Sequence, residues 1–196
     1  MKMHIFKLLL LLFALLLSSF QSGTKPRLNK AEAQQAFAYL NQIRTKPEKF
    51  QQKFPFLSKH KIRETALIWN DQLAKVAETK ALDMAKRKYF AHVDPEGYGM
   101  NYYINKGGYK LNKDWLKSKR SNNFESLAYG LKDGASTINT LIIDKGIPGL
   151  GHRKHLLGIG DWNRSLTDIG IGFASIERNT GYLETYVCII IAKHDW

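Results

Sequence analysis

A nearly continuous apolar run close to the C-terminal end is the feature that most constrains how this chain can fold. Residues 186–192 form a run of strand length, which predicts a central strand buried on both faces. Residues 169–174 alternate large apolar residues with small ones, which is typical of a strand whose second face is lined by small side chains. Residues 179–181, Asn-Thr-Gly, supply a turn between the two, so we expect an antiparallel hairpin.

The chain ahead of this hairpin carries helical patterns. Asn29 is expected to cap a helix that ends before Pro47, and Asn70 is expected to cap the clearest helix of the sequence. Shorter helices are expected at 98–106 and 135–144. Helices first and strands last predict an α+β domain whose sheet is covered by helices.

The single cysteine narrows the class of protein. Cys188 is the only cysteine among 196 residues, which excludes an intramolecular disulfide framework and a multi-cysteine metal site. It lies inside the apolar run, so we expect it in the core rather than in catalysis. Hydrophobic residues make up 44% of the chain, which excludes a disordered protein.

The N-terminal segment resembles a secretory signal in its layout. Lys2 lies near the start of the chain, and Lys7 directly precedes an apolar run over residues 8–17. Small and polar residues then follow up to Gly23. The run is too short to span a bilayer comfortably, although the lack of an Ala-x-Ala site leaves an uncleaved anchor as the alternative. We therefore expect a signal peptide at 1–23, a single domain at 24–196 without a transmembrane span, and a secreted, periplasmic or cell-envelope location.

The net charge of +13 favours anionic partners. Residues 1–23 carry two lysines and no acid, so +11 remains on the mature part. No helix-turn-helix, zinc-finger or RNP-like pattern supports nucleic acid as a partner. An exported basic protein is better matched to an anionic envelope polymer or a lipid.

Three short polar segments do not fit a simple pattern of core and surface. His92 follows the long helix, where a single histidine is more often structural than a ligand. Glu125 lies among apolar and small residues, so it is either exposed or paired with a group such as a histidine, because an unpaired buried carboxylate is costly. His152 and His155 are three residues apart, close enough on a helical turn to share a metal ion, although this spacing is common by chance.

In their order along the chain, these segments resemble the motifs of the CAP superfamily, the SCP-like domain of cysteine-rich secretory proteins, antigen 5 and plant pathogenesis-related proteins. The resemblance is to the disulfide-free bacterial branch and covers roughly residues 30–193. Five motifs carry it: Trp69-Asn70-Asp71-Gln72-Leu73-Ala74, Phe90-Ala91-His92 with Asp94-Pro95-Glu96-Gly97, Glu125-Ser126-Leu127-Ala128, Gly151-His152-Arg153-Lys154-His155-Leu156-Leu157, and Thr167-Asp168-Ile169-Gly170-Ile171-Gly172.

The resemblance implies an α–β–α sandwich with a central antiparallel sheet, and an open cavity lined by two histidines and two acidic residues. His92, Glu125 and His152 match three of these four positions. Asp144 is the nearest candidate for the second acid, where the family has the longer Glu. Three neighbouring residues depart from the family pattern of Gly, Asn and Asn: Phe124, Ser126 and His155.

Two neutral imidazoles with nearby carboxylates suit a divalent cation such as zinc, so His92 and His152 are the expected metal ligands. The same groups could act as general acid and base. Ser126 lies outside any Gly-x-Ser-x-Gly elbow, so the sequence offers no activated nucleophile, and no motif for an organic cofactor is evident.

These observations leave three hypotheses open. The first is a secreted or envelope-associated binding protein with a His/Glu-lined cleft. The second is a metal-assisted hydrolase acting on a peptide or an envelope polymer. The third is a structural surface module that uses only its charge and its rigid fold. Because members of the superfamily share no common reaction, the resemblance does not make this chain an enzyme.

The leader gives the first testable prediction. Because the apolar run ends at Leu17 and peptidase sites follow within a few residues, we expect the mature chain to begin between Ser19 and Lys25. N-terminal sequencing of the exported protein checks this. Material that begins at Met1 would show an anchored protein instead.

Overall fold

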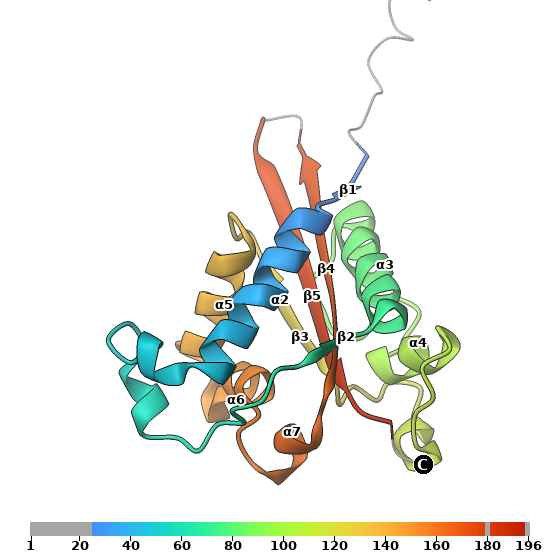
Figure 1. The fold of residues 1–196 in the computed structure, drawn as a ribbon. Helices are drawn as coiled ribbons and strands as arrows, with labels where there is room; N and C mark the ends of the chain where they lie inside the picture. Colours follow the sequence, from blue (N-terminus) through green and yellow to red (C-terminus); the bar gives the residue numbers. More distant parts are fainter. Residues whose placement is uncertain (1–24, 179–180, 195–196) are drawn as a thin grey trace, which may run out of the picture.

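In a computed structural model, residues 25–178 and 181–194 form a sheet with helices on both of its faces (Figure 1). The expected leader at 1–23 lies outside these described residues, and so do Asn179 and Thr180 of the expected turn. Within the described part of the chain, no helix is both long enough and apolar enough to cross a membrane.

Two long strands form the centre of the sheet. Strands β4 (Asp168–Glu177) and β5 (Leu183–Ala192) pair antiparallel along their whole length, which confirms the hairpin expected from the apolar runs. β3 (Glu125–Tyr129) pairs antiparallel with the other side of β5. The far side of β4 is paired with two short strands, antiparallel with β1 (Arg27–Leu28) and parallel with β2 (Ile68–Trp69). The strand order is therefore β1-β4-β5-β3, with β3 at one edge.

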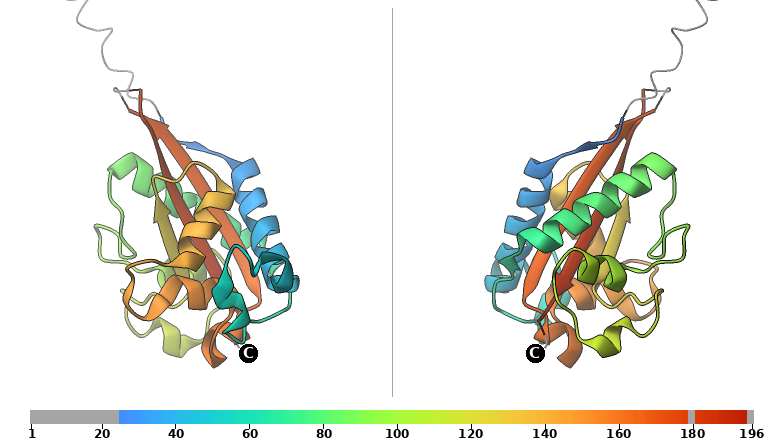
Figure 2. Two further views of the ribbon diagram at one scale, coloured as in Figure 1. Left: turned by 90° about the vertical axis from the view of Figure 1, so that its left-hand side faces the viewer. Right: turned by 90° about the vertical axis from the view of Figure 1, so that its right-hand side faces the viewer.

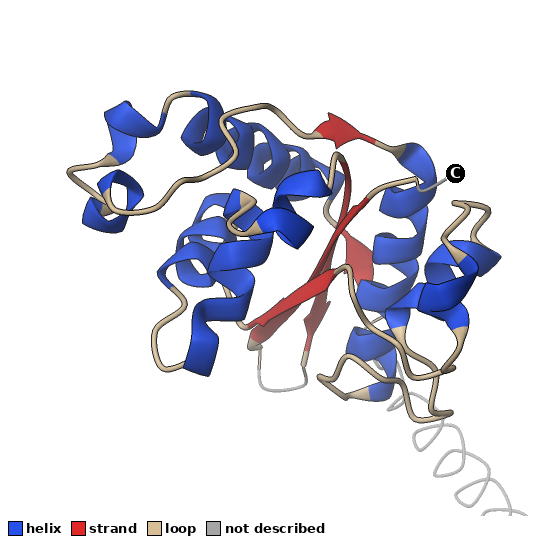
Figure 3. Cartoon of the chain, turned by 90° about the horizontal axis from the view of Figure 1, so that it is seen from below, coloured by secondary structure: helices blue, strands red, loops and turns tan. Residues whose placement is uncertain are grey.

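Helices cover the two faces separately, which gives the α–β–α sandwich. Helices α2 (Lys30–Thr45), α5 (Gly134–Ile143) and α6 (Gly151–Leu157) lie on one face, and α3 (Asp71–Arg87) and α4 (Met100–Lys106) lie on the other (Figures 1 and 2). Seen from below, the strands run between helices on both sides (Figure 3). The remaining helical segments are α7 and the 3-10 turns η1–η4, at Asp161–Ser165, Pro47–Phe50, Pro55–Ser58, Lys113–Leu116 and Pro148–Leu150.

Both expected helix caps are present. The side chain of Asn29 accepts a hydrogen bond from the Glu32 amide at 3.2 Å, and the side chain of Asn70 accepts one from the Leu73 amide at 3.0 Å. Asp133 begins α5 with a capping box that it forms with Ser136. The expected helix at 98–106 is confirmed over its last seven residues, since α4 starts only at Met100.

The small residues on one face of β4 let α3 lie directly against the sheet. A Cβ atom at Gly170 would lie 2.1 Å from the backbone nitrogen of Ala74, and one at Gly172 would lie 2.2 Å from the carbonyl oxygen of Ala77. Real side chains do not tolerate such contacts, so the helix rests on the strand backbone itself. The alternation of large and small residues in β4 therefore sets the position of α3.

Adding a methyl group at this contact should destabilise the protein. We expect Gly170→Ala to lower the free energy of unfolding by about 2–3 kcal/mol, because the atoms that it meets are helix backbone and cannot rotate away. Gly151→Ala is the control, since a Cβ atom there would have no neighbour within 4 Å and the backbone at Gly151 is helical. Urea unfolding measures both variants, and equal losses would contradict the close packing of α3.

Candidate functional site

His152 is placed by reciprocal contacts between the end of α5 and the start of α6. Asp144 follows α5 in the left-handed region at φ 52°, which Asp tolerates better than most residues. Its Oδ2 accepts hydrogen bonds from the backbone amides of His152 (2.9 Å) and Arg153 (3.2 Å). Arg153 in turn donates to the carbonyl oxygens of Ile142 and Ile143 at the end of α5. The two helix ends therefore hold each other, and His152 occupies a fixed position.

The imidazole of His152 is also oriented by Asp144. Its Nδ1 lies 2.7 Å from Asp144 Oδ1, and the side chains of Asp144 and His152 are 1% and 24% exposed. Because the carboxylate accepts from Nδ1–H, a neutral ring carries its lone pair on Nε2. No described residue hydrogen-bonds to that Nε2 atom, which leaves it available to a ligand.

His92 and Glu125 form a second pair of the same kind. Glu125 opens the edge strand β3, and its Oε2 lies 2.7 Å from Nδ1 of His92. The Glu125 side chain is fully buried, whereas that of His92 is 46% exposed. Of the two alternatives for Glu125, the paired one is therefore correct. As at His152, no described residue bonds to Nε2 of His92.

Cys188 lies behind this pair, in the core as expected. Its thiol donates to Glu125 Oε1 at 3.4 Å. Burial and the neighbouring Glu125 carboxylate raise the pKa of Cys188, so the sulfur stays protonated and is not a nucleophile.

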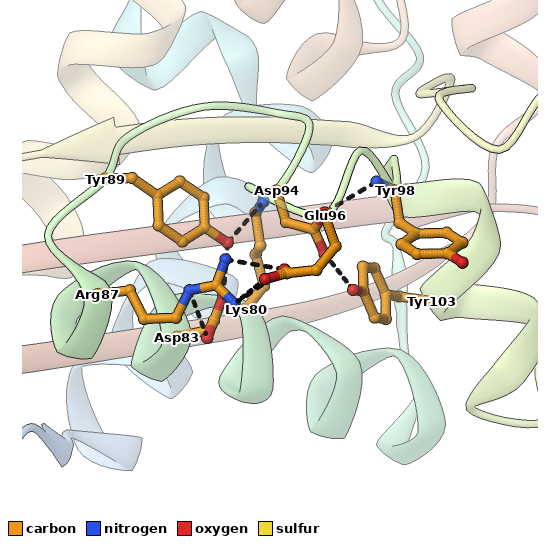
Figure 4. Close-up of polar contacts among 8 residues, drawn as sticks. All are labelled: Lys80, Asp83, Arg87, Tyr89, Asp94, Glu96, Tyr98 and Tyr103. Atoms are coloured by element: carbon orange, nitrogen blue, oxygen red, sulfur yellow. Dashed lines mark hydrogen bonds and ion pairs between the residues drawn. The ribbon is translucent and has the colours of Figure 1, made fainter.

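The loop that carries His92 is held by a polar network on α3. His92 lies five residues beyond the last residue of the helix. The buried ammonium of Lys80 donates to the carbonyl oxygen of His92 at 3.3 Å. It also donates to the hydroxyl of Tyr89 at 3.3 Å (Figure 4). The Tyr89 hydroxyl donates to Asp83 at 2.7 Å. The backbone at His92 is thereby tied to the helix that packs on the sheet.

The rest of the loop is fixed in the same way. Arg87 binds both carboxylate oxygens of Glu96 at 2.8–2.9 Å, and Asp94 accepts from the Tyr98 amide at 2.8 Å and from the Tyr103 hydroxyl (Figure 4). These groups line a cavity of about 550 Å³ beside α3 and α4. Its polar side chains mostly pair with one another, so their evident role is to hold the His92 loop.

His155 is used inside the protein. Its Nδ1 lies 2.8 Å from the Ser126 hydroxyl, and its Nε2 lies 3.4 Å from the carbonyl oxygen of Ile191. Because a carbonyl can only accept, Nε2 carries the proton and Ser126 donates to Nδ1. Both ring nitrogens are engaged, which argues against a metal ion shared by His152 and His155. Ser126 is 1% exposed, so its hydroxyl does not face solvent.

The electrostatics of His155 link the two histidine–carboxylate pairs. Burial, partly offset by the bond to Ile191, lowers the pKa of His155 to about 4. Charges on His152, Arg44 and His92 act in the same downward direction. The fold thus brings His92 and His152, 60 residues apart in sequence, into the electrostatic neighbourhood of one buried ring.

A groove of about 380 Å³ follows the edge strand, and we call it the edge groove. His152 and Asp144 line it, whereas His92 and Glu125 do not, although Phe90 in the His92 loop does. Of the four site residues predicted from the sequence, two therefore line the groove and two lie beside it. The lining residues are Phe90, Leu127, Ala128, Tyr129, Leu131, Thr140, Leu141, Ile143, Asp144, Lys145, Ile147 and His152.

The donor set limits how a cation could bind here. In residues 25–178 and 181–194, no three His, Cys, Asp or Glu side chains are grouped so as to enclose a metal ion. The Nε2 atoms of His92 and His152 are the available nitrogen donors, while the carboxylates are already bonded to the opposite ring nitrogens. Carboxylate-oriented imidazoles are typical of zinc ligands, so these residues fit a two-histidine site completed by water or ligand. Metal binding by His92 and His152 stays a prediction.

Comparison with protein families gives a match over most of the chain. The model of the cysteine-rich secretory protein (CAP) family matches residues 37–190. No curated protein matches the chain.

Two solved structures resemble this fold. One is an outer surface protein from Borrelia burgdorferi, with 17% identity, a TM-score of 0.53, and coverage of 87% of this chain and 99% of that one. The other is an extracellular protein containing an SCP domain from Bacillus anthracis, with 21% identity and a TM-score of 0.48. That match covers 84% of this chain and 41% of that longer protein.

The buried His155 should make stability depend on pH. Its pKa is about 4 in the folded state and near 6.5 when unfolded, so between these values the unfolded chain binds more protons. We therefore expect stability to fall as the pH decreases through this window, by up to about 1.4 kcal/mol per pH unit from this residue. In His155→Asn, which keeps an acceptor for Ser126, urea unfolding at a series of pH values should give a flatter curve. An unchanged slope would contradict this role of His155.

Proposed function

The chain belongs to the cysteine-rich secretory protein family, and we propose that it is a secreted or envelope-associated binding protein whose edge groove takes a ligand beside His152 and His92. One observation carries the proposal. Two histidines at the same sheet edge are each held by a buried carboxylate at 2.7 Å, and the other nitrogen of each ring has no partner among the described residues. Buried carboxylates that orient partly exposed imidazoles are costly to build for stability alone, and they prepare the outer nitrogens for a ligand.

We also propose that a divalent cation such as zinc binds to Nε2 of His92 and of His152. The cation would supply a Lewis acid at the groove. Glu125 and Asp144 would fix the rings from behind and raise their basicity, which is the usual contribution of carboxylates hydrogen-bonded to zinc-ligating histidines.

The charge and the leader support the proposed location and ligand class. The basic mature part, at +11, matches an anionic envelope polymer or a lipid. The leader at 1–23 would direct export, and the two similar structures are described as extracellular and outer-surface proteins.

Hydrolysis is the second candidate, favoured by one feature of the same pairs. A histidine held by a carboxylate is the arrangement that a general base needs. The described residues offer no serine or cysteine nucleophile to the groove, because Ser126 and Cys188 are buried and hydrogen-bonded. A water molecule would then have to attack the substrate. Turnover of peptides or polymers by the unchanged chain, with loss of turnover in both His92→Ala and His152→Ala, would favour an enzyme.

Zinc titration of the purified mature protein tests the metal site. We expect His92→Ala and His152→Ala each to remove most of the affinity, and the double variant to lose little more than either single one, because residues that act as one unit are not additive. Glu125→Gln should weaken binding by roughly 10–100-fold through loss of ring orientation. Affinity should fall at acidic pH, because a protonated imidazole cannot bind a metal ion.

His155→Asn is the matched control, because both nitrogens of that ring are bonded inside the protein. Its zinc affinity should stay close to that of the unchanged chain. Independent, additive losses at His92 and His152, or a loss concentrated at His155, would show that the ligands are assigned to the wrong residues.

A further inference from the structure

The edge strand β3 presents backbone groups to the edge groove. On its inner side, the Ile191 amide donates to the Phe124 carbonyl at 2.9 Å, and the Gly130 amide donates to the Thr185 carbonyl at 2.9 Å. Antiparallel pairing alternates, so the even-numbered residues between these two bonds also face β5. The amide and carbonyl groups of Glu125, Leu127 and Tyr129 therefore point away from the sheet, at an edge where no other described strand pairs.

The outward groups of Leu127 and Tyr129 open into a hollow, not onto a flat surface. Both residues line the edge groove, and no described residue hydrogen-bonds to their outward backbone atoms. The groove also has large apolar side chains that are 43–49% exposed: Phe90, Tyr129, Ile143 and Ile147. Open backbone groups between exposed apolar walls match an added β-strand, whose backbone pairs with the edge while its alternate side chains contact the walls.

The charged residues of the groove indicate which kind of added strand would bind there. Its one acid, Asp144, is already bonded to the His152 ring and to two backbone amides. Lys145 lines the groove and makes no ion pair with a described residue. A second copy of this chain, which has the same net positive charge, would bring like charge to the same place.

We propose that the edge groove binds an acidic polypeptide segment in extended conformation, which adds to the sheet as a strand beside β3. The inference rests on the proposed ligand-binding function and names the class of ligand. Hydrogen bonds from Leu127 and Tyr129 give affinity for any extended backbone, while Lys145 and the apolar walls select acidic residues alternating with apolar ones.

A labelled octapeptide of alternating valine and glutamate is the probe, with fluorescence anisotropy as the readout and EDTA present throughout. Two further peptides carry N-methyl groups, one on every valine and the other on every glutamate. Since alternate residues of a strand point their amides to the same side, one of these peptides should bind about tenfold more weakly and the other should bind nearly as well as the parent. Replacing glutamate by lysine should also weaken binding about tenfold.

Two variants at one position test the edge from the protein side. Tyr129→Pro removes an outward amide that no described residue uses, which an edge strand tolerates, and Tyr129→Ala removes the same ring but keeps the amide. We expect Tyr129→Pro to bind the parent peptide about tenfold more weakly than Tyr129→Ala. Leu183→Ala changes an exposed apolar residue outside the groove lining and should leave binding unchanged. Circular dichroism checks that each variant folds, and the N-methyl series needs no variant.

Several outcomes overturn the inference. Equal binding by both N-methylated peptides, or no difference between Tyr129→Pro and Tyr129→Ala, would show that backbone pairing is not used. If the protein self-associates and only Tyr129→Pro abolishes this association, the edge groove binds a second copy of the chain and not a separate peptide. If anionic phospholipid vesicles bind and displace the peptide equally in both Tyr129 variants, the edge groove binds a lipid surface. Because EDTA removes divalent cations, the two proposals fail separately. Absence of zinc binding in the unchanged chain, or zinc binding unaltered in the histidine variants, would refute only the metal proposal. Failure of the peptide to bind while zinc binding is intact would refute only this one.

Discussion

The contact between α3 and the glycine face of β4 positions the rest of the molecule. A Cβ atom at Gly170 or Gly172 would lie within 2.2 Å of helix backbone, so α3 packs directly against the backbone of β4. Lys88 caps the end of α3 in the left-handed region, and His92 further along the chain bonds to Glu125 of β3. Lys80, from the same helix, bonds to the His92 carbonyl. The packing of α3 on Gly170 and Gly172 therefore helps to fix the position of His92.

The site is assembled from both helical layers across one strand. Adjacent residues of β3 bond to opposite layers, because successive side chains of a strand point to opposite faces. Glu125 holds His92 from the α3 side, while Ser126 holds His155 of α6. Asp144 then orients His152 on the same short helix. A five-residue strand thus connects the two histidine–carboxylate pairs, and a shift of β3 by one residue would turn Glu125 and Ser126 to the opposite faces of the sheet.

Sequence patterns predicted the features of the fold that depend on residues close together in the chain. The β4–β5 hairpin, the caps at Asn29 and Asn70 and the burial of Cys188 all follow from local periodicity or side-chain chemistry. The family resemblance located His92, Glu125 and His152, but it left Asp144 only as the nearest acid.

Contacts between residues far apart in the chain could not be predicted from sequence patterns. β3 was not recognised because four of its five residues are buried, so no polar alternation marks it. Without β3 there was no reason to connect Ser126 with His155, although both were noted as departures from the family pattern. The structure explains them together: a hydroxyl and an imidazole form one hydrogen bond at 2.8 Å where the family usually has two Asn. The bond between Asp144 and His152 depends on a left-handed residue after α5, which side-chain identity alone does not reveal.

Cavity size alone would direct attention to the α3 side of the sheet, away from the edge groove. The larger hollow, about 550 Å³, is walled by Lys80, Asp94 and Arg87, each already bonded to a neighbour. A polar ligand entering there would have to break those bonds before making its own, which cancels most of the gain. The edge groove is smaller, at about 380 Å³, but it borders an imidazole nitrogen and strand backbone that bond to no described residue. A ligand gains most where it pairs with groups that the folded chain leaves without partners, and Nε2 of His152 and the outward backbone groups of Leu127 and Tyr129 are such groups at the edge groove.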